Sequence, residues 1–204
     1  GTGAVGNAQQ GMSVGLSADG RTAIIGGMAD NSSQGGAWIF TGDGLGNWTQ
    51  EGNKLVGTGA VGAARQGVSV AISADGNTAI VGGNYDNGSQ GAAWVYTRSG
   101  NTWSQQGNKL VGSGASGTFI YQGQSVSISA DGNTVVIGGP SDNNAQGASW
   151  VFTRSGNAWT QQGTKLVGSG SIGPLVGQGS GVALSADGRT MMLGGYYDDN
   201  DLGA

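Results

Sequence analysis

A repeat of 56 residues constrains the fold of this chain more than any other feature of its sequence. The tetrapeptide Ser-Ala-Asp-Gly recurs at an unbroken step of 56 residues, beginning at Ser17, Ser73, Ser129 and Ser185. A Gly-Gly pair follows every copy, and a Gly-Ala-rich tryptophan segment and a Lys-Leu-Val segment follow three of them. Self-similarity at a fixed period is the signature of a repeat protein, in which each unit is one supersecondary structure.

The second copy shows what the unit contains. Two short apolar runs flank the polar turn at residues 74–77, where an Asp-Gly pair accepts the positive backbone angles of a tight hairpin. The first run alternates, which places on one side Val68, Val70 and Ile72. The second run, residues 78–81, lacks such alternation, which indicates a strand covered on both faces. The pattern predicts a β-hairpin inside a stack of sheets.

The rest of the unit predicts two further strands and no helix. In the first copy these strands are expected at residues 37–41 and 48–56, and turn glycines separate them. Four antiparallel strands in each repeat are typical of a β-propeller blade, whereas a β-solenoid, the main alternative, has shorter rungs. We therefore predict an all-β propeller of four-stranded antiparallel blades, about three and a half of them in this chain. The expected units are blade 1 at 1–56, blade 2 at 57–111, blade 3 at 112–167 and the first half of blade 4 at 168–204.

Tryptophans occupy two fixed positions in each complete unit. A lone 56-residue sheet cannot offset its ordering entropy, so neighbouring units must share a core, and large apolar groups are needed there. We predict that all six are structural: Trp38, Trp94 and Trp150 on the third strands, and Trp48, Trp103 and Trp159 on the fourth. The alternative is a lectin, because aromatic faces also bind sugar rings.

Composition excludes several classes of function. Only 10% of the residues are charged, the net charge is −4, and the cations form no cluster, so nucleic-acid binding is not expected. The absence of cysteine and histidine excludes thiolate nucleophiles, histidine bases and the usual zinc sites. The apolar runs are too short for a membrane span. No cofactor is predicted.

The loop between the second and third strands is the richest polar segment. Its copies are expected on one face of the propeller as a ring of carboxylates and amides, with tyrosines able to stack on a sugar. The candidate ligand-binding residues are Asp30, Asn31, Tyr85, Asp86, Asn87, Asp142, Asn143, Tyr197 and Asp198. The competing interpretation is that Asp and Asn pin the loop through side-chain to backbone bonds. Phe119 and Tyr121, in a linker, are either exposed aromatics or cover a seam between blades.

The acidic residues argue against a metal site and against catalysis. Each hairpin turn offers one carboxylate, whereas a hard cation takes six or more oxygens. The aspartates of these turns are therefore interpreted as turn-forming: Asp19, Asp75, Asp131 and Asp187. No metal is predicted, and the weak candidates for a cation are Asp198, Asp199 and Asp201. The repeat places its acidic residues in equivalent surroundings, whereas carboxylate catalysis needs two carboxylates in different surroundings. We therefore predict that the protein is not an enzyme.

Three segments of the second unit resemble the FG-GAP repeat of integrin α-subunit propellers and related surface proteins. They are Gln66-Gly67-Val68-Ser69-Val70, Val81-Gly82-Gly83 and Gly91-Ala92-Ala93-Trp94-Val95-Tyr96. The resemblance covers essentially the whole chain and implies a propeller that serves adhesion and ligand binding outside the cell. The sequence departs from the family at its first aromatic position, which is occupied by Gln10, Gln66, Gln122 and Gln178. It also departs at the family's Ala-Pro, which becomes glycine followed by Met28, Asn84, Pro140 or Tyr196.

These observations lead to one expected function and two alternatives. We expect a non-enzymatic extracellular or cell-surface scaffold for adhesion, ligand binding, or surface or filament assembly. The alternatives are a carbohydrate-binding propeller and, less favoured, a polysaccharide-active enzyme that uses carboxylates. Expected partners are other propeller blades or copies of the same chain, with a protein or glycan ligand. Three and a half blades would also leave an apolar face and strand edges exposed, which favours association.

Overall fold

The computed structural model describes residues 1–171, 173, 175–198 and 203. They form three four-stranded antiparallel sheets and one two-stranded antiparallel sheet. The first sheet contains β1 (Ser13–Leu16), β2 (Thr22–Gly26), β3 (Ala37–Gly42) and β4 (Trp48–Gln50). The second contains β5 (Ser69–Ile72), β6 (Thr78–Gly83), β7 (Ala92–Ser99) and β8 (Thr102–Gln105). The third contains β9 (Ser125–Ile128), β10 (Thr134–Gly139), β11 (Ala148–Ser155) and β12 (Ala158–Gln161), and the last pairs β13 (Gln178–Leu184) with β14 (Met191–Gly195).

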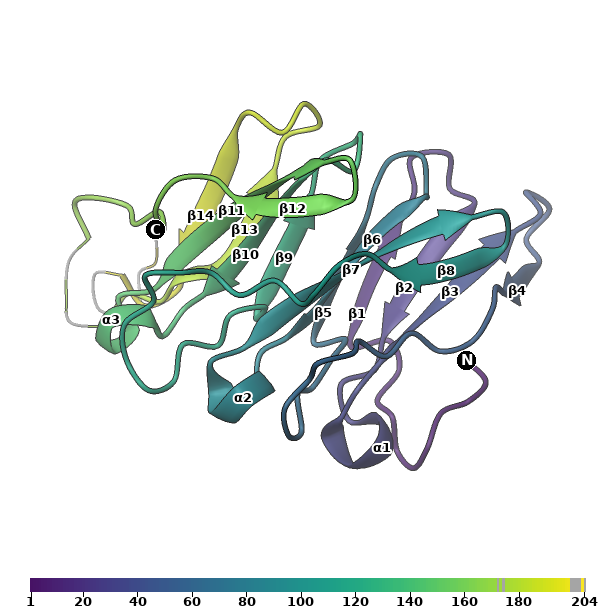
Figure 1. Ribbon diagram of the computed structural model, residues 1–204, viewed down its shortest axis with the longest axis horizontal. Coiled ribbons are helices and arrows are strands. Elements are labelled where there is room, and N and C mark those ends of the chain that lie inside the picture. Colours follow the sequence, from purple (N-terminus) through teal and green to yellow (C-terminus); the bar gives the residue numbers. More distant parts are fainter. Residues whose placement is uncertain (172, 174, 199–202, 204) are drawn as a thin grey trace.

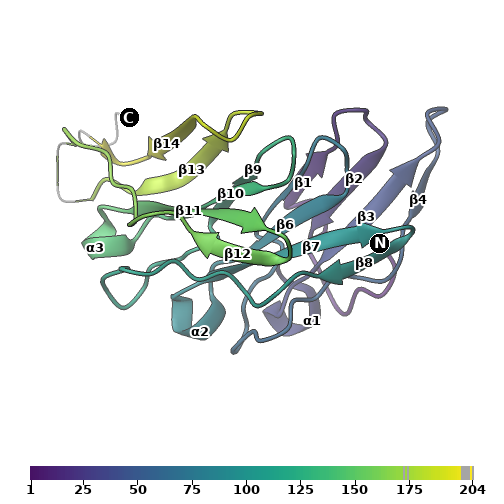
Figure 2. The same cartoon turned by 45° about the horizontal axis from the view of Figure 1, so that its top comes forward.

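The sheets stand side by side in chain order, and each is built from one sequence unit (Figure 1). Consecutive strands pair within each sheet, and the first strands β1, β5, β9 and β13 each contact the next one. Figure 2 shows the same succession from another side. A β-solenoid would instead run its sheets through successive repeats. The predicted all-β fold of propeller-like, four-stranded antiparallel sheets is confirmed.

Apolar side chains lie on both faces of the second sheet. On the third strand, Trp94 and Tyr96 pack in one core with residues of the first unit. The intervening Ala93 and Val95 pack in another core with residues of the third unit. The alternation along this strand therefore points to two neighbours and not to solvent on one side.

Two glycines at the end of the second strand allow the units to approach closely. A Cβ on Gly82 would lie 2.1 Å from the carbonyl oxygen of Gly123 in the next unit. A Cβ on Gly83 would lie 2.7 Å from the ring of Trp94. The second contact explains why glycine is required at this position: the large indole occupies the space of a methyl group.

Two local features differ from the expectations. The hairpin turns place only their glycine at positive φ, for example 68° at Gly76, and the preceding aspartate stays at negative φ. The fourth strand is shorter than predicted and ends at Gln50, because a polar segment with Gly52 at φ 71° follows it. The chain returns to the sheet only at Leu55, which pairs with Ala37.

The six tryptophans fall into two environments. Those on the third strands, Trp38, Trp94 and Trp150, are fully buried, and each indole Nε1 donates a hydrogen bond to a backbone carbonyl oxygen at 2.8–2.9 Å. On the fourth strands, Trp103 and Trp159 pack against the cores that their units share with the preceding ones. Trp48, the corresponding residue of the first unit, has 45% of its surface exposed.

This difference predicts unequal effects of truncation. Replacement of Trp94 with alanine leaves a large cavity between two sheets, and we expect it to lower the free energy of unfolding by about 3–5 kcal/mol. The matched change Trp48→Ala removes a half-exposed ring and should cost about 1 kcal/mol. Denaturant titrations of both variants measure the difference, and equal losses would contradict it.

Candidate functional site

The predicted loop ring forms three similar turns on one edge of the molecule. They are α1 (Asp30–Ser33), α2 (Asp86–Ser89) and α3 (Asp142–Ala145), which lie along the same edge in Figures 1 and 2. Their second residues take left-handed angles, with φ near 50°, and are Asn31, Asn87 and Asn143. They are therefore tight left-handed turns and not regular helices. Asparagine tolerates this conformation better than most residues.

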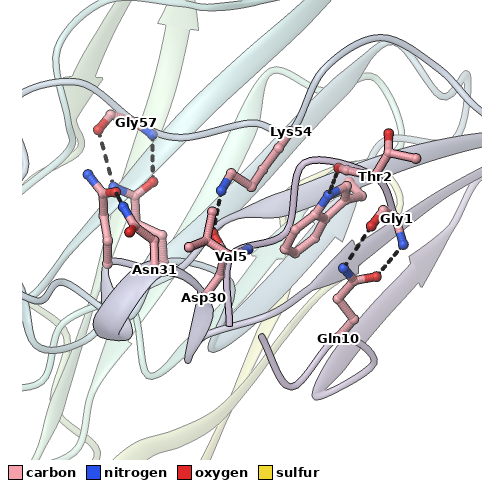
Figure 3. A network of polar contacts seen from close by, with 11 residues as sticks. Gly1, Thr2, Val5, Gln10, Asp30, Asn31, Lys54 and Gly57 are labelled. Atoms are coloured by element: carbon pink, nitrogen blue, oxygen red, sulfur yellow. Dashed lines mark hydrogen bonds and ion pairs between the residues drawn. The ribbon is translucent and has the colours of Figure 1, made fainter. Parts of the chain in front are cut away.

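The aspartate of each turn points into the protein. Asp86 is fully buried, its Oδ2 lies 2.5 Å from Nζ of Lys109, and its Oδ1 accepts a hydrogen bond of 2.7 Å from the amide of Val61. The same arrangement recurs in the first unit with Asp30 and Lys54, which Figure 3 shows, and in the third with Asp142 and Lys165. These carboxylates tie the linker and the end of each unit to the turn, so they do not form an exposed ring.

The amide side chains of the three turns remain at the surface. Asn31, Asn87 and Asn143 are exposed, and two of them donate a hydrogen bond to a glutamine three residues later. The lysines that neutralise the aspartates are recognisable in the sequence only as the first residue of Lys-Leu-Val. Their pairing partners lie 23 or 24 residues upstream, a separation that no local motif reveals.

The glutamine that lies at or just before the first strand of each unit forms a second repeated contact. Oε1 of Gln66 accepts a hydrogen bond of 2.5 Å from the amide of Gly57, and its Nε2 donates to the carbonyl oxygen of the same glycine at 3.2 Å. Gln10 binds Gly1 in the same way, as Figure 3 shows. A side-chain amide thus holds both backbone groups of one linker residue, a contact that an aromatic ring cannot make.

The aspartates of the hairpin turns are held by their own turns. In the third unit the Ser129 hydroxyl donates to Oδ1 of Asp131 at 2.5 Å and the Asn133 amide donates to the same oxygen at 3.0 Å. These hydrogen bonds hold the pKa of Asp131 below its usual range. The same contacts from serine and backbone lower the pKa of Asp19 and Asp187.

Tyr85 belongs to a row of stacked side chains. The guanidinium carbon of Arg65 lies 3.8 Å from the centre of the Tyr85 ring, and the ring of Tyr121 lies 5.4 Å from it at an angle of 40°. Phe119 continues the row, with 6.3 Å between its ring centre and that of Tyr121. Beside the row is a groove of about 340 Å³ at the junction of the first three units. It is lined by Met12, Met28, Arg65, Val68, Asn84, Tyr85, Tyr121 and Gln124.

The fourth unit carries the remaining candidates. Tyr197 is exposed and packs edge-on against Tyr196 with 4.7 Å between ring centres, while Asp198 is buried. Asp199 and Asp201 lie outside the described residues. Among the residues that are described, no three acidic side chains are placed to hold a metal ion. Within the same residues, no helix is both long and apolar enough to cross a membrane.

Comparison with known proteins identifies the fold alone. No protein-family model matches the chain, and no curated protein does. Solved structures do: a functionally unknown protein from Desulfotomaculum acetoxidans (TM-score 0.57), a candidate 6-phosphogluconolactonase from Bacteroides uniformis (0.61) and a candidate TolB from Agrobacterium tumefaciens (0.51). Each is 14% identical to this chain and covers 89%, 90% and 90% of it. The chain spans about half of the lengths of these three proteins, 47%, 49% and 53% respectively. The second and third of these structures have propeller-like folds.

The buried ion pairs predict an asymmetric response to mutation. Lys109→Met leaves the Asp86 carboxylate buried without its counter-charge, which costs about 3–5 kcal/mol in comparable cases, and the lower end applies because Lys109 is partly exposed. Denaturant titration measures the loss. The double variant Lys109→Met with Asp86→Asn should recover part of it, since the uncompensated charge is gone; a double variant no more stable than Lys109→Met would argue against this explanation.

The hairpin turns predict a loss of stability in acid. Because the folded pKa of Asp131 is lowered, its contribution is fully present above the unfolded value of about 3.9 and disappears as the pH falls through the folded value. The melting temperature of the parent should therefore exceed that of Asp131→Asn at pH 6, and the gap should narrow below pH of about 4. A gap that stays constant with pH would contradict this role.

Proposed function

We propose that this protein is a non-enzymatic, extracellular or cell-surface scaffold of the FG-GAP type, which works by packing blade against blade. The chain is proposed to supply about three and a half blades of a propeller or of a repetitive assembly. Its partners would be further blades of the same repeat, in a longer chain or a second copy. The resemblance to adhesive surface propellers supports the location, and the single observation that carries the assembly role is the exposed face of the first unit.

The interfaces between units use the same atoms each time. The hydroxyl of a first-strand serine donates a hydrogen bond of 2.8 Å to a glycine carbonyl oxygen of the following unit, in the pairs Ser13–Gly67, Ser69–Gly123 and Ser125–Gly179. The amide of Ala18 donates to the carbonyl oxygen of Ala74 at 3.0 Å, and the next two junctions repeat this bond. The same two surfaces meet in the same geometry at all three junctions between units. This repetition supports the docking of a further blade.

The first unit presents the face that its successors bury. Val14 is 68% exposed and Leu16 is 57% exposed, whereas one repeat later Val70 is buried and Ile72 packs against the core. Half-exposed Trp48 lies on the same face. Exposed apolar side chains that share one face of a sheet favour an interaction surface there. Because three internal junctions cover the corresponding side chains with the preceding unit's sheet, we propose another blade as the occupant here.

The opposite face of the fourth unit completes a head-to-tail arrangement. Met192 is 73% exposed, while its counterparts in the first three units, Ile24, Ile80 and Val136, are fully buried. Two different faces that fit each other form a heterologous interface, which closes into a ring or continues as a filament. The fourth unit has Gly181 in place of the docking serine, so this junction would lack one of the repeated hydrogen bonds.

Charge on the exposed face should abolish self-association. The double variant Val14→Glu with Leu16→Glu places two carboxylates on side chains that are already exposed in the monomer, so the fold should survive. Light scattering across a concentration series should show a rising mass for the parent and a constant monomer mass for the variant. The matched control Val5→Glu with Val61→Glu, at exposed linker valines, should associate like the parent. A parent that stays monomeric at high concentration would refute the assembly role.

A further inference from the structure

The second strand of the fourth unit has an open edge. In the complete units, β2, β6 and β10 each pair with the first strand of their sheet on one side and with its third strand on the other. Within the part of the chain that the structure describes, β14 pairs with β13 alone (Figure 1). An open edge presents unpaired N–H and C=O groups and is a template for another strand. The edge alone does not select an occupant, so the residues beside it must.

A cavity of about 240 Å³ lies beside this edge, and its lining matches the surroundings of a buried tryptophan. In the second unit, a Cβ on Gly57 would lie 2.2 Å from the indole of Trp94, and a Cβ on Gly83 would lie 2.7 Å from it. The first and third units repeat both contacts. The equivalents of these two glycines in the fourth unit are Gly168 and Gly195, and both line the cavity.

The strand register points to the same side chain. In the complete units the buried tryptophan is paired with the residue two positions before the second glycine of the Gly-Gly pair. These residues are Ile25, Val81 and Ile137. Leu193 holds this position in β14 and lines the cavity. A tryptophan on a strand added in the same register would therefore enter the cavity.

A hydrogen-bond acceptor for the indole is also in position. Each buried indole donates its Nε1–H to the carbonyl oxygen of one linker residue, which is Thr2, Thr58 or Ser113. Ser169 is the equivalent residue of the fourth unit, and it lines the cavity. A buried indole N–H usually needs such a partner. The cavity therefore offers both the apolar space and the polar contact that tryptophan requires.

The frame around the cavity is complete without a third strand. The side-chain amide of Gln178 binds both backbone groups of Gly168, with 2.6 Å to its nitrogen and 3.1 Å to its oxygen. The amide of Gly203 donates to the carbonyl oxygen of Asp198 at 2.9 Å, the bond that closes the turn before the third strand in each complete unit. A site that is formed beforehand loses less conformational freedom on binding.

We propose that the edge of β14 and this cavity form an acceptor site for an extended peptide segment that carries a tryptophan, namely the third strand of a further repeat unit. Its backbone extends the sheet and its indole fills the cavity, which is recognition by β-strand addition. The strand comes from outside the three complete units, because β3, β7 and β11 are already paired on both sides. This site goes beyond the packing of blade faces and does not depend on it, since it uses a strand edge.

The probe is a synthetic peptide with the sequence of residues 147–161, which contains the third and fourth strands of the third unit. Calorimetry with the full chain should show saturable binding. The same peptide with Trp150→Ala should bind at least about tenfold more weakly, because a tryptophan that fills a pocket is a typical binding hot spot. A shuffled peptide of the same composition should not bind. Absence of binding, or equal binding by either control peptide, would overturn the proposal.

The variant Gly168→Ala separates binding from folding. A Cβ at this position first meets the flexible end of Gln178, at 3.3 Å, so the melting temperature of the free chain should change little. The same methyl group would collide with an incoming indole, as the distance of 2.2 Å at Gly57 shows, so affinity for the peptide should fall at least about tenfold. Gly181→Ala, on β13 with no atom within 4 Å of the added Cβ, should bind like the parent. Unchanged binding by Gly168→Ala would overturn the assignment.

Two further measurements separate this site from the packing of blade faces. The double variant Val14→Glu with Leu16→Glu should bind the peptide like the parent, whether or not the parent self-associates, because both side chains belong to the first unit. Loss of peptide binding in that variant would place the site elsewhere and overturn the proposal. Light scattering of Gly168→Ala should match the parent. A lower mass would show that copies of the chain fill the site by strand exchange, which would overturn the assigned occupant.

Discussion

Each sheet of this protein is apolar on both faces, and every other feature of the structure follows from that constraint. A sheet of about 50 residues cannot bury enough surface alone to offset the entropy lost on folding, so the stable object is the stack and not the unit. The close approach of Gly82 to the Gly123 carbonyl shows how tightly the stack is built. The same constraint makes the first unit's outer face a surface that favours a partner.

The polar residues of the repeat serve mainly to place the linkers between sheets. Asp86 and Lys109 hold the turn against the end of the unit, Gln66 holds Gly57, and the indole of Trp94 holds Thr58. All of these bonds recur one repeat away with the same atoms. A buried ion pair adds little net stability over apolar packing. We infer that the ion pair here fixes the register of the linker against the turn, because only one alignment of the two pairs every group.

The sequence predicts the structural features that depend on local residue patterns. It does not predict those that depend on a partner far away in the chain. The hairpins, the third strands and the two-faced burial around Trp94 follow from periodicity and turn residues. The short fourth strand, the left-handed turn at Asn87 and the lysine partner of Asp86 do not, because each depends on a contact with another part of the unit. Lys109 illustrates the limit: its role exists only once the fold has brought it to a carboxylate 23 residues upstream.

Repetition itself separates scaffold from ligand chemistry. A residue that recurs at every step must satisfy the same geometry in every unit, so its role is in the stack. A ligand, in contrast, breaks the symmetry and needs groups that differ between units. The position of Arg65 holds glutamine, arginine, tyrosine and glycine in successive copies, and that of Asn84 holds methionine, asparagine, proline and tyrosine. Those two variable positions meet at one groove, at the junction of the first three units, whereas the loop aspartates recur unchanged and are buried in the first three units.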